Sequence, residues 1–270
     1  MKRQLTALLL TVFALSLVGC GKKAAVQSET RTVYAMDTVM NLTVYGENAA
    51  AALESAEQEL HTLDESVLSR TAEGSELYAL NAANGETVIY GADDALPALI
   101  EAALTISDAT NGAFDPTLAP VLDAWGFTKD EHHVPSADEL AALLARTGRD
   151  KVALEKRADG YSVALSDGTQ LDLGGIAKGY AADLLRAQLE KESITSATLD
   201  LGGDVFVMGR KIDGSDWRIA VKDPADTESY LGVVSAADKF IVTSGVYERY
   251  FEENGVRYHH IIDPKTGRPP

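Results

Sequence analysis

Cysteine is nearly absent from this sequence of 270 residues: Cys20 stands alone, so no disulfide can form within the chain. The fold must therefore rest on its hydrophobic core, even in an oxidising compartment. Positive charge is also scarce, with 24 Lys and Arg against 41 Asp and Glu and a net charge of −17. So acidic a protein lacks the basic surface that binds nucleic acid, and charge would not attract it to anionic lipids. An anionic ligand would need a local device, such as a helix N-terminus, a lysine or a metal ion.

The N-terminus holds the longest apolar run, Leu5 to Val18, directly after Lys2 and Arg3. The run is shorter than the roughly 20 residues that a membrane-spanning helix needs. It ends in "LVGC", which resembles a bacterial lipobox. An ordinary signal peptide or a buried helix are the alternatives, but the position of Cys20 directly after the run favours a lipoprotein. We therefore predict a signal peptide at residues 1–19, a lipidated Cys20 with a flexible tether at 20–31, and one domain at 32–270.

Periodicity predicts an α+β fold, with helices concentrated in the N-terminal half and a mixed or antiparallel sheet. Apolar residues recur at three- and four-residue spacing from Leu53 to Val67 and again from Ala95 to Asn111, which is typical of helices. A capping box at Ser136 predicts a third helix that ends at Gly148. Residues 32–45 alternate like a strand or hairpin, and short strands dominate from Lys151 onward. Residues 69–85 and 113–127 are predicted to be loops.

The pentapeptide "LDLGG" occurs twice, at Leu171–Gly175 and Leu199–Gly203, on either side of a helix predicted from Ile176 to Lys191. This arrangement is typical of a strand–helix–strand unit. If the two strands are parallel, both glycine turns lie at one edge of the sheet, where α/β proteins place ligands. We therefore expect one site that is built from two similar corners.

At the first corner, Gly174 and Gly175 permit a tight turn, and Lys178 lies in the first turn of the helix. The free backbone N–H groups of that turn could bind a phosphate, and Asp172 could hold a hard cation beside it. A plain turn with a solvated lysine is an equally good reading of this segment. The second corner adds Asp200 and Asp204, for which a tight turn with solvated aspartates is the simpler interpretation.

Two further segments carry chemistry-bearing side chains. In "GAFDPTLAP", Phe114 could pack on a flat ring or anchor a loop to the core, and Asp115 precedes a rigidifying proline. His259 and His260 are adjacent, so on a strand they would point to opposite faces, one buried and one exposed. We do not interpret them as metal ligands, because ligands usually share one face.

Together these segments resemble the ApbE-type FAD:protein FMN transferases, a family of flavin transferases that are often bacterial lipoproteins. Seven segments match in family order: "MDT" at Met36–Thr38, "SRTAEGSELYALN" at Ser69–Asn81, "GAFDPTLAP" at Gly112–Pro120, "LDLGGIAKGYAAD" at Leu171–Asp183, "LDLGGDVFVMG" at Leu199–Gly209, "VTSGVYERYF" at Val242–Phe251 and "HHIIDPKTGRP" at His259–Pro269. Any one of them is a weak signal, but seven in register make a strong one.

The resemblance implies a reaction. Such enzymes split the pyrophosphate of FAD and transfer FMN to a Ser or Thr hydroxyl of an acceptor protein, which releases AMP and forms a phosphoester. It also implies an ApbE-like fold, a Mg²⁺ ion, and acceptors among the extracytoplasmic, FMN-carrying subunits of membrane redox complexes. The predicted lipid anchor would hold the enzyme at the extracytoplasmic face of the bacterial membrane.

The resemblance also implies roles for individual residues. Met36 would contact the flavin, Lys178 would contact the dinucleotide, and the backbone carbonyl of Gly175 would bind Mg²⁺. The remaining residues would line the FAD site: Ala113, Phe114, Asp115, Asp172 and Ile262.

The sequence departs from the family at three places. Asp37 stands where glycine is common in the family. Near Thr71 the family often has an aromatic residue that covers the flavin, and a threonine cannot stack in this way. Family members also continue past the segment that ends here at Pro270, with a "D…DxxT"-like stretch that supplies the other Mg²⁺ ligands. We therefore expect those ligands to lie beyond Pro270.

Two other functions fit the same sequence. An FAD pyrophosphatase of this family would use water in place of the acceptor hydroxyl, and the nucleophile is not encoded in the enzyme's own sequence. A lipid-anchored solute-binding protein would also combine a lipobox with an acidic α/β body. Such proteins usually have two similar lobes, and this sequence has no such halves.

Overall fold

A computed structural model describes residues 27–127, 129, 131–226 and 228–270 of the chain. The predicted signal peptide and Cys20 lie outside these residues. The first strand, β1 (Ser28–Ala35), begins four residues before the predicted domain start at residue 32, because Ser28 to Arg31 pair with β2 instead of forming tether. Within the described residues, no helix has both the length and the apolar character to cross a membrane.

The largest sheet has five strands in the order β1-β2-β6-β7-β10, and every neighbouring pair is antiparallel. Its other strands are β2 (Thr38–Tyr45), β6 (Ser196–Asp200), β7 (Val205–Met208) and β10 (Lys239–Ile241). Of the two predicted alternatives, a strand or a hairpin, the structure has the hairpin, in which β1 and β2 join through a two-residue turn. Met36 and Asp37 both have positive φ, 51° and 56°, which is the conformation of a type I′ turn. Asp tolerates this conformation, so the turn forms without the glycine that is common in the family.

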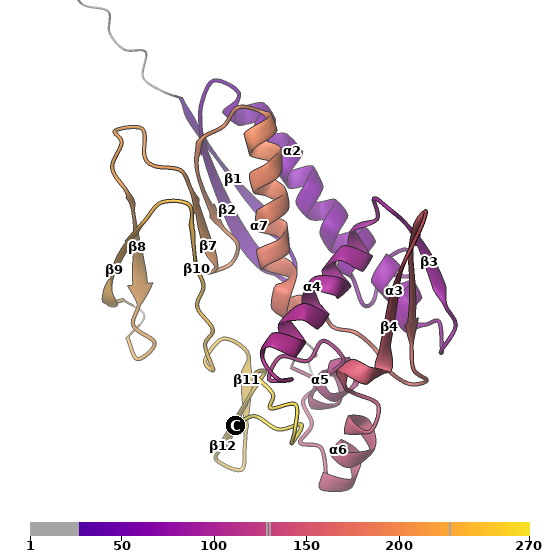
Figure 1. Ribbon diagram of the computed structural model, residues 1–270. Helices are drawn as coiled ribbons and strands as arrows, with labels where there is room; N and C mark the ends of the chain where they lie inside the picture. The colour runs from indigo at the N-terminus through magenta and orange to yellow at the C-terminus, as the bar shows by residue number, and fades with distance from the viewer. Residues whose placement is uncertain (1–26, 128, 130, 227) are drawn as a thin grey trace, which may run out of the picture.

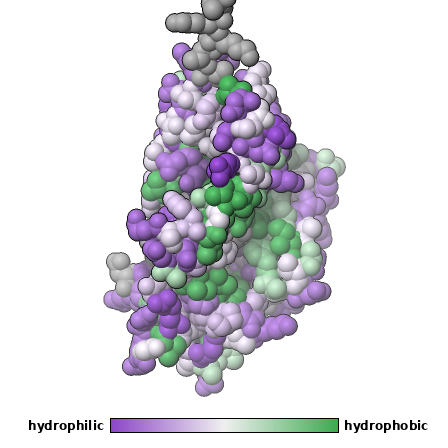
Figure 2. Space-filling model, turned by 90° about the vertical axis from the view of Figure 1, so that its left-hand side faces the viewer, coloured by the Kyte–Doolittle hydropathy of each residue, from purple (hydrophilic) through white to green (hydrophobic). Residues whose placement is uncertain are grey.

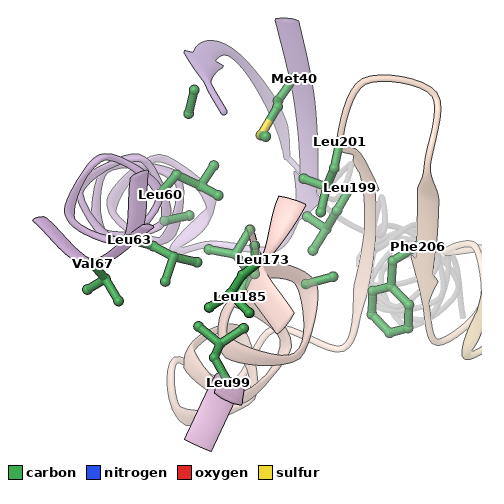
Figure 3. Close-up of a cluster of buried hydrophobic side chains, with 14 of the residues drawn as sticks. Met40, Leu60, Leu63, Val67, Leu99, Leu173, Leu185, Leu199, Leu201 and Phe206 are labelled. Atoms are coloured by element: carbon green, nitrogen blue, oxygen red, sulfur yellow. The ribbon is translucent and has the colours of Figure 1, made fainter. Parts of the chain in front are cut away.

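Two long helices pack beside each other against this sheet (Figure 1). They are α2 (Ala49–His61), which continues as the π-helical segment η1 (Thr62–Leu68), and α7 (Gly174–Lys191). Their apolar residues meet those of β2 and β6 in one core (Figure 3). Leu173 and Leu201, which flank the glycines of the two corners, both insert into this core and are at most 1% exposed. The core thereby anchors both corners.

A second group of elements packs near the C-terminal end of α2 and the N-terminal end of α7 (Figure 1). It contains a three-stranded antiparallel sheet in the order β3-β5-β4. Its elements are α3 (Glu76–Asn81), β3 (Val88–Gly91), α4 (Ala95–Ala109), α5 (Ala119–Trp125), α6 (Ala137–Leu144), the 3₁₀ turn η2 (Arg149–Lys151), β4 (Val152–Arg157) and β5 (Gly160–Leu165).

Most predicted helices are confirmed, with two corrections. The segments predicted as loops contain the short helices α3 and α5, which buried residues such as Leu77, Leu80 and Trp125 attach to the core. The capping box is present, since the Glu139 N–H donates to Ser136 Oγ, but α6 ends at Leu144 and not at Gly148.

The C-terminal segment packs on α5 through an aromatic cluster. Trp125 contacts Phe251 and Tyr258 from the hairpin β11 (Tyr250–Glu253) and β12 (Val256–His259). Its indole N–H donates to the carbonyl of Gly267 at 2.7 Å. This buried hydrogen bond joins two segments that lie far apart in the sequence.

The hairpin β8 (Trp217–Lys222) and β9 (Tyr230–Ala236) lies at one side of the molecule (Figure 1). It packs on β7 mainly through Trp217 and Ala236. Figure 2 views this side, where apolar residues gather on the surface. The exposed apolar residues of β9 are Tyr230, Leu231, Val233 and Val234.

Candidate functional site

The first corner is an extended segment held by side chains. The Asn81 side chain binds both backbone groups of Leu171: its amide donates to the carbonyl at 3.0 Å, and its oxygen accepts from the N–H at 2.8 Å. The Asp172 N–H donates to the carbonyl of Pro116. Residues 171–173 therefore belong to no strand, and the prediction of a strand–helix–strand unit was wrong. The segment instead lies between α3 and the "GAFDPTLAP" loop.

The second corner follows β6 and closes on itself. Asp200 Oδ1 accepts the N–H of Gly203 at 2.8 Å. Gly202 has a φ of 74°, and a Cβ there would overlap the side chain of Thr38. Only glycine fits this position, and it brings the corner against the end of the β1–β2 turn.

Lys178 joins the two corners. Its Nζ donates to the carbonyl of Gly202 at 3.2 Å and lies 3.5 Å from Asp204 Oδ2. The corners therefore lie together, as predicted, although for a different reason. The neighbouring strands of the main sheet are antiparallel, so no parallel edge aligns the corners. Lys178, at the start of the second turn of α7, connects them instead.

The Phe114 ring packs directly on the first turn of α7. A Cβ on Gly175 would lie 2.8 Å from Phe114 Cε2, so the glycine permits this close approach. Asp115 Oδ1 accepts both the N–H and the hydroxyl of Thr117, at 2.9 and 2.6 Å, which fixes the loop. Ala113 is exposed beside them. The loop thus places Phe114 at the corner that carries Asp172.

Met36 lies in the β1–β2 turn, two residues before Thr38, whose side chain lies against Gly202 of the second corner. The Met36 N–H donates to Asp64 Oδ2 at 2.9 Å, from the π-helical segment η1. Such π-helical segments occur frequently at functional sites. The sequence analysis did not identify Asp64, whose position outside a regular α-helix had no visible signal.

Not all predicted site residues share one cluster. Phe114 packs on Gly175, and Asp172 accepts the N–H of the neighbouring Gly174. From the same helix, Lys178 reaches Gly202, which lies against Thr38 at the end of the β1–β2 turn. Ile262 belongs to a different cluster, since it packs on the group that contains Leu118, Trp125 and Phe251.

Arg70 is a second residue that the sequence analysis missed. Its guanidinium donates to Asp172 Oδ2 at 3.1 Å and to Asp123 Oδ2 at 2.6 Å. It also lines a cavity of about 520 Å³. The other residues of this cavity are Thr71, Tyr78, Asn81, Ala82, Asp123, Lys129 and Gln170. Its presence as an arginine in an acidic chain, within a motif that matches the family, was the sequence signal that could have identified Arg70.

The described residues do not form a complete metal site. Among residues 27–127, 129, 131–226 and 228–270, no group of three or more His, Cys, Asp or Glu side chains is arranged to hold a metal ion. The carbonyl of Gly175 alone would not hold Mg²⁺, which prefers six oxygen ligands.

The two adjacent histidines differ in burial, as predicted, although β12 ends at His259 and His260 lies just after it. His259 is buried, and His260 is partly exposed. His260 Nδ1 lies 3.2 Å from the carbonyl oxygen of Arg249, to which it can donate. Burial lowers the pKa of His260, because it disfavours the charged imidazolium.

This geometry can be compared with known proteins. A sequence model of the ApbE family matches residues 36–270. The chain belongs to the ApbE family. It is 38% identical over 266 residues to an FAD:protein FMN transferase of Treponema pallidum, which covers 93% of this chain and 73% of that protein.

Solved structures of ApbE proteins agree with this fold. The Thermotoga maritima ApbE protein matches with a TM-score of 0.83 at 35% identity, over 90% of this chain and 78% of that one. The apo form of the Pseudomonas stutzeri flavinyl transferase ApbE matches with a TM-score of 0.78 at 31% identity, over 91% and 77%. The predicted ApbE-like α+β fold is thereby confirmed.

Proposed function

We propose that this protein transfers FMN from FAD to a Ser or Thr hydroxyl of an acceptor protein. The observation that carries the proposal is the pair of adjoining "LDLGG" corners, joined through Lys178, in a chain of the ApbE family. The names of its relatives, FAD:protein FMN transferase and flavinyl transferase, support the reaction.

The proposed reaction is a phosphoryl transfer. The acceptor oxygen attacks the phosphorus of the FMN half of FAD and forms a P–O bond. The bond between this phosphorus and the bridging oxygen breaks, AMP leaves with that oxygen, and the hydroxyl proton passes to solvent. Such transfers depend on positioned groups and on neutralised charge rather than on a covalent enzyme intermediate.

The residues of this chain would bind and orient the dinucleotide. Lys178, near the N-terminus of α7, supplies a positive charge that would favour a phosphate, and the positive end of the helix dipole lies on the same side. Phe114, held by the Asp115–Thr117 turn, offers an aromatic face beside Gly175. Asp172, at the first corner, would bind the dinucleotide, and Met36, in the β1–β2 turn near the second corner, would contact the flavin.

We also propose that the reaction needs Mg²⁺. The two corners carry the carboxylates of Asp172, Asp200 and Asp204, and the nearby cations are Arg70 and Lys178. The carboxylates would repel the pyrophosphate of FAD, and a divalent cation would relieve this repulsion. A chelator should then abolish turnover, and excess Mg²⁺ should restore it. Full turnover in the chelator would contradict this requirement.

The activity test uses the purified protein with FAD, Mg²⁺ and an extracytoplasmic FMN-carrying subunit of a membrane redox complex as acceptor. Mass spectrometry should find the acceptor heavier by one FMN moiety, with AMP released in equal amount. FMN and AMP with an unmodified acceptor would identify a pyrophosphatase instead. Absence of FAD binding would support the solute-binding alternative. A Lys178→Met variant tests whether the transfer depends on the residue that joins the two corners.

The location is a separate proposal. We propose that Cys20 carries a lipid that holds the protein at the extracytoplasmic face of the membrane, beside its acceptors. Support comes from the lipobox-like "LVGC" sequence. Fractionation of cells that express the wild type or Cys20→Ser tests it: the variant should leave the membrane fraction. An equal distribution of the two proteins would contradict a lipid anchor.

A further inference from the structure

Arg70 is bound between two carboxylates that belong to different segments. Its distances are 2.6 Å to Asp123 on α5 and 3.1 Å to Asp172 at the first corner. Its side chain is only 22% exposed. Charge-assisted hydrogen bonds of this kind are stronger than neutral ones, and partial burial reduces their screening by solvent and salt.

The bond from Arg70 completes the fixation of Asp172. Oδ1 of Asp172 accepts the N–H of Gly174 at 2.8 Å, and Oδ2 accepts from Arg70. With one bond on each oxygen, the carboxylate cannot rotate about its terminal torsion without losing at least one of them. Each oxygen keeps a second lone pair for a ligand.

The guanidinium keeps this position at a cost. Its Nε is buried and has no hydrogen-bond partner among the described residues. A buried donor without a partner is unfavourable. The two carboxylates therefore determine how the guanidinium lies, and the arrangement does not maximise the hydrogen bonds of the arginine itself.

The backbone around Asp172 is held by the same motif. Asn81, at the end of the segment that begins with Ser69 and Arg70, binds both backbone groups of Leu171. The motif "SRTAEGSELYALN" thus fixes the main chain with Asn81 and the carboxylate with Arg70.

From this geometry we propose that Arg70 is a positioning residue for FAD binding, which acts by orienting the Asp172 carboxylate. The inference rests on the proposed function, because it assumes that Asp172 contacts FAD. Asp123 serves as the anchor that keeps Arg70 in place.

A double-mutant cycle on the dissociation constant for FAD tests this role, with flavin fluorescence as the readout. Arg70→Met should raise the dissociation constant roughly tenfold, because Asp172 loses a charged hydrogen-bond partner. In an Asp172→Asn background, the same change should have little further effect, since the oriented carboxylate is already absent. Arg70→Lys should recover part of the loss, because lysine keeps the charge but cannot bridge two carboxylates as a planar fork.

Two further variants guard against a merely structural effect. Arg31→Met removes an ion pair of the same 2.6 Å length, Arg31–Glu57, and should leave FAD binding unchanged. Asp123→Asn keeps the side-chain size but loosens the anchor of Arg70. It should raise the dissociation constant in the wild-type background and not in Asp172→Asn. Asp123→Asn thus provides a test if Arg70→Met does not fold.

The outcomes separate the two proposals. Additive effects of Arg70→Met and Asp172→Asn, or an unchanged dissociation constant in Arg70→Met, would overturn the positioning role. A protein that binds FAD but transfers no FMN would overturn the proposed function, while the binding cycle would still decide the role of Arg70. A wild type that binds no FAD would overturn both, since Asp172 would then have no dinucleotide to contact.

Discussion

Gly175 shows how much depends on a single missing side chain. The Phe114 ring occupies the space that a Cβ at residue 175 would need. We predict that Gly175→Ala displaces the ring and weakens FAD binding severalfold, which a fluorescence titration would measure. Gly179→Ala is the matched control, because no atom lies within 4 Å of a Cβ at that position in the same helix. The control should keep FAD affinity and gain up to about 1 kcal/mol of stability from helix propensity. Equal affinities for both variants would contradict the role of this contact.

Glu76 makes the stability of the fold depend on pH. Burial raises the pKa of its carboxyl group, and the charge of Asp94 raises it further. Because the pKa is higher in the folded state, the stabilising contribution of Glu76 is fully present below its unfolded pKa and is lost as pH rises through the folded pKa. Glu76→Gln should therefore raise the melting temperature at pH 7, and the gain should shrink toward pH 4.

Thermal unfolding across this pH range measures the effect of Glu76→Gln. Glu73→Gln, at an exposed loop position in the same motif, is the control and should change little at any pH. A gain that stays constant with pH would show that removal of the charge is not its cause.

At the scale of elements, contacts far apart in the sequence stabilise short helices. α5 has seven residues, too few to be stable alone. Trp125, which is fully buried, joins α5 to the hairpin of β11 and β12 and to the carbonyl of Gly267. The same contact supports the segment that carries Ile262.

We predict that Trp125→Phe lowers the free energy of unfolding by about 2–4 kcal/mol. The change leaves a cavity and a carbonyl without its partner. Denaturant unfolding measures the loss. Trp217→Phe makes the same substitution on the other side of the molecule, where the indole N–H donates to Met208 at 3.3 Å. The control should leave protease resistance of the C-terminal segment unchanged, whereas Trp125→Phe should reduce it. Equal cleavage rates in both variants would contradict this linkage.

At the scale of the whole molecule, FAD binding should stabilise the fold. The corners that would hold FAD are anchored in the main core by Leu173 and Leu201. FAD should therefore bind the folded protein and not the unfolded chain. At a hundredfold excess over its dissociation constant, FAD should add about 2.7 kcal/mol. Thermal shift assays with FAD, and with riboflavin as a control that lacks the pyrophosphate, measure this effect. An equal shift by riboflavin would show that the phosphate corner contributes no binding energy.

Long amphipathic segments were predictable from the sequence. The helix from Leu53, the helix from Ala95 and the helix after Gly175 all formed close to their predicted bounds. The periodicity of the first two is clear because one face of each contacts a core. The third helix was predicted from its place between the two "LDLGG" segments. Residue types in seven ordered motifs also identified the family before any contact was known.

The short helices α3 and α5 and the segment at residues 171–173 were not predictable, because tertiary contacts stabilise them. Arg70 and Asp64 were missed for a related reason: their partners lie 102 and 28 residues away in the sequence. Local propensity and residue spacing do not indicate contacts between residues so far apart in the sequence.

The long helices and the residue types of the site could be predicted from the sequence alone, because helix signals and residue type are local properties. The sequence also indicated that two "LDLGG" corners serve one site. How the corners meet depends on tertiary contacts: the main sheet is antiparallel, and Lys178 reaches from α7 to Gly202. The same packing brings Arg70 to Asp172. These contacts depend on which buried faces pack together, and packing is a property of the whole chain.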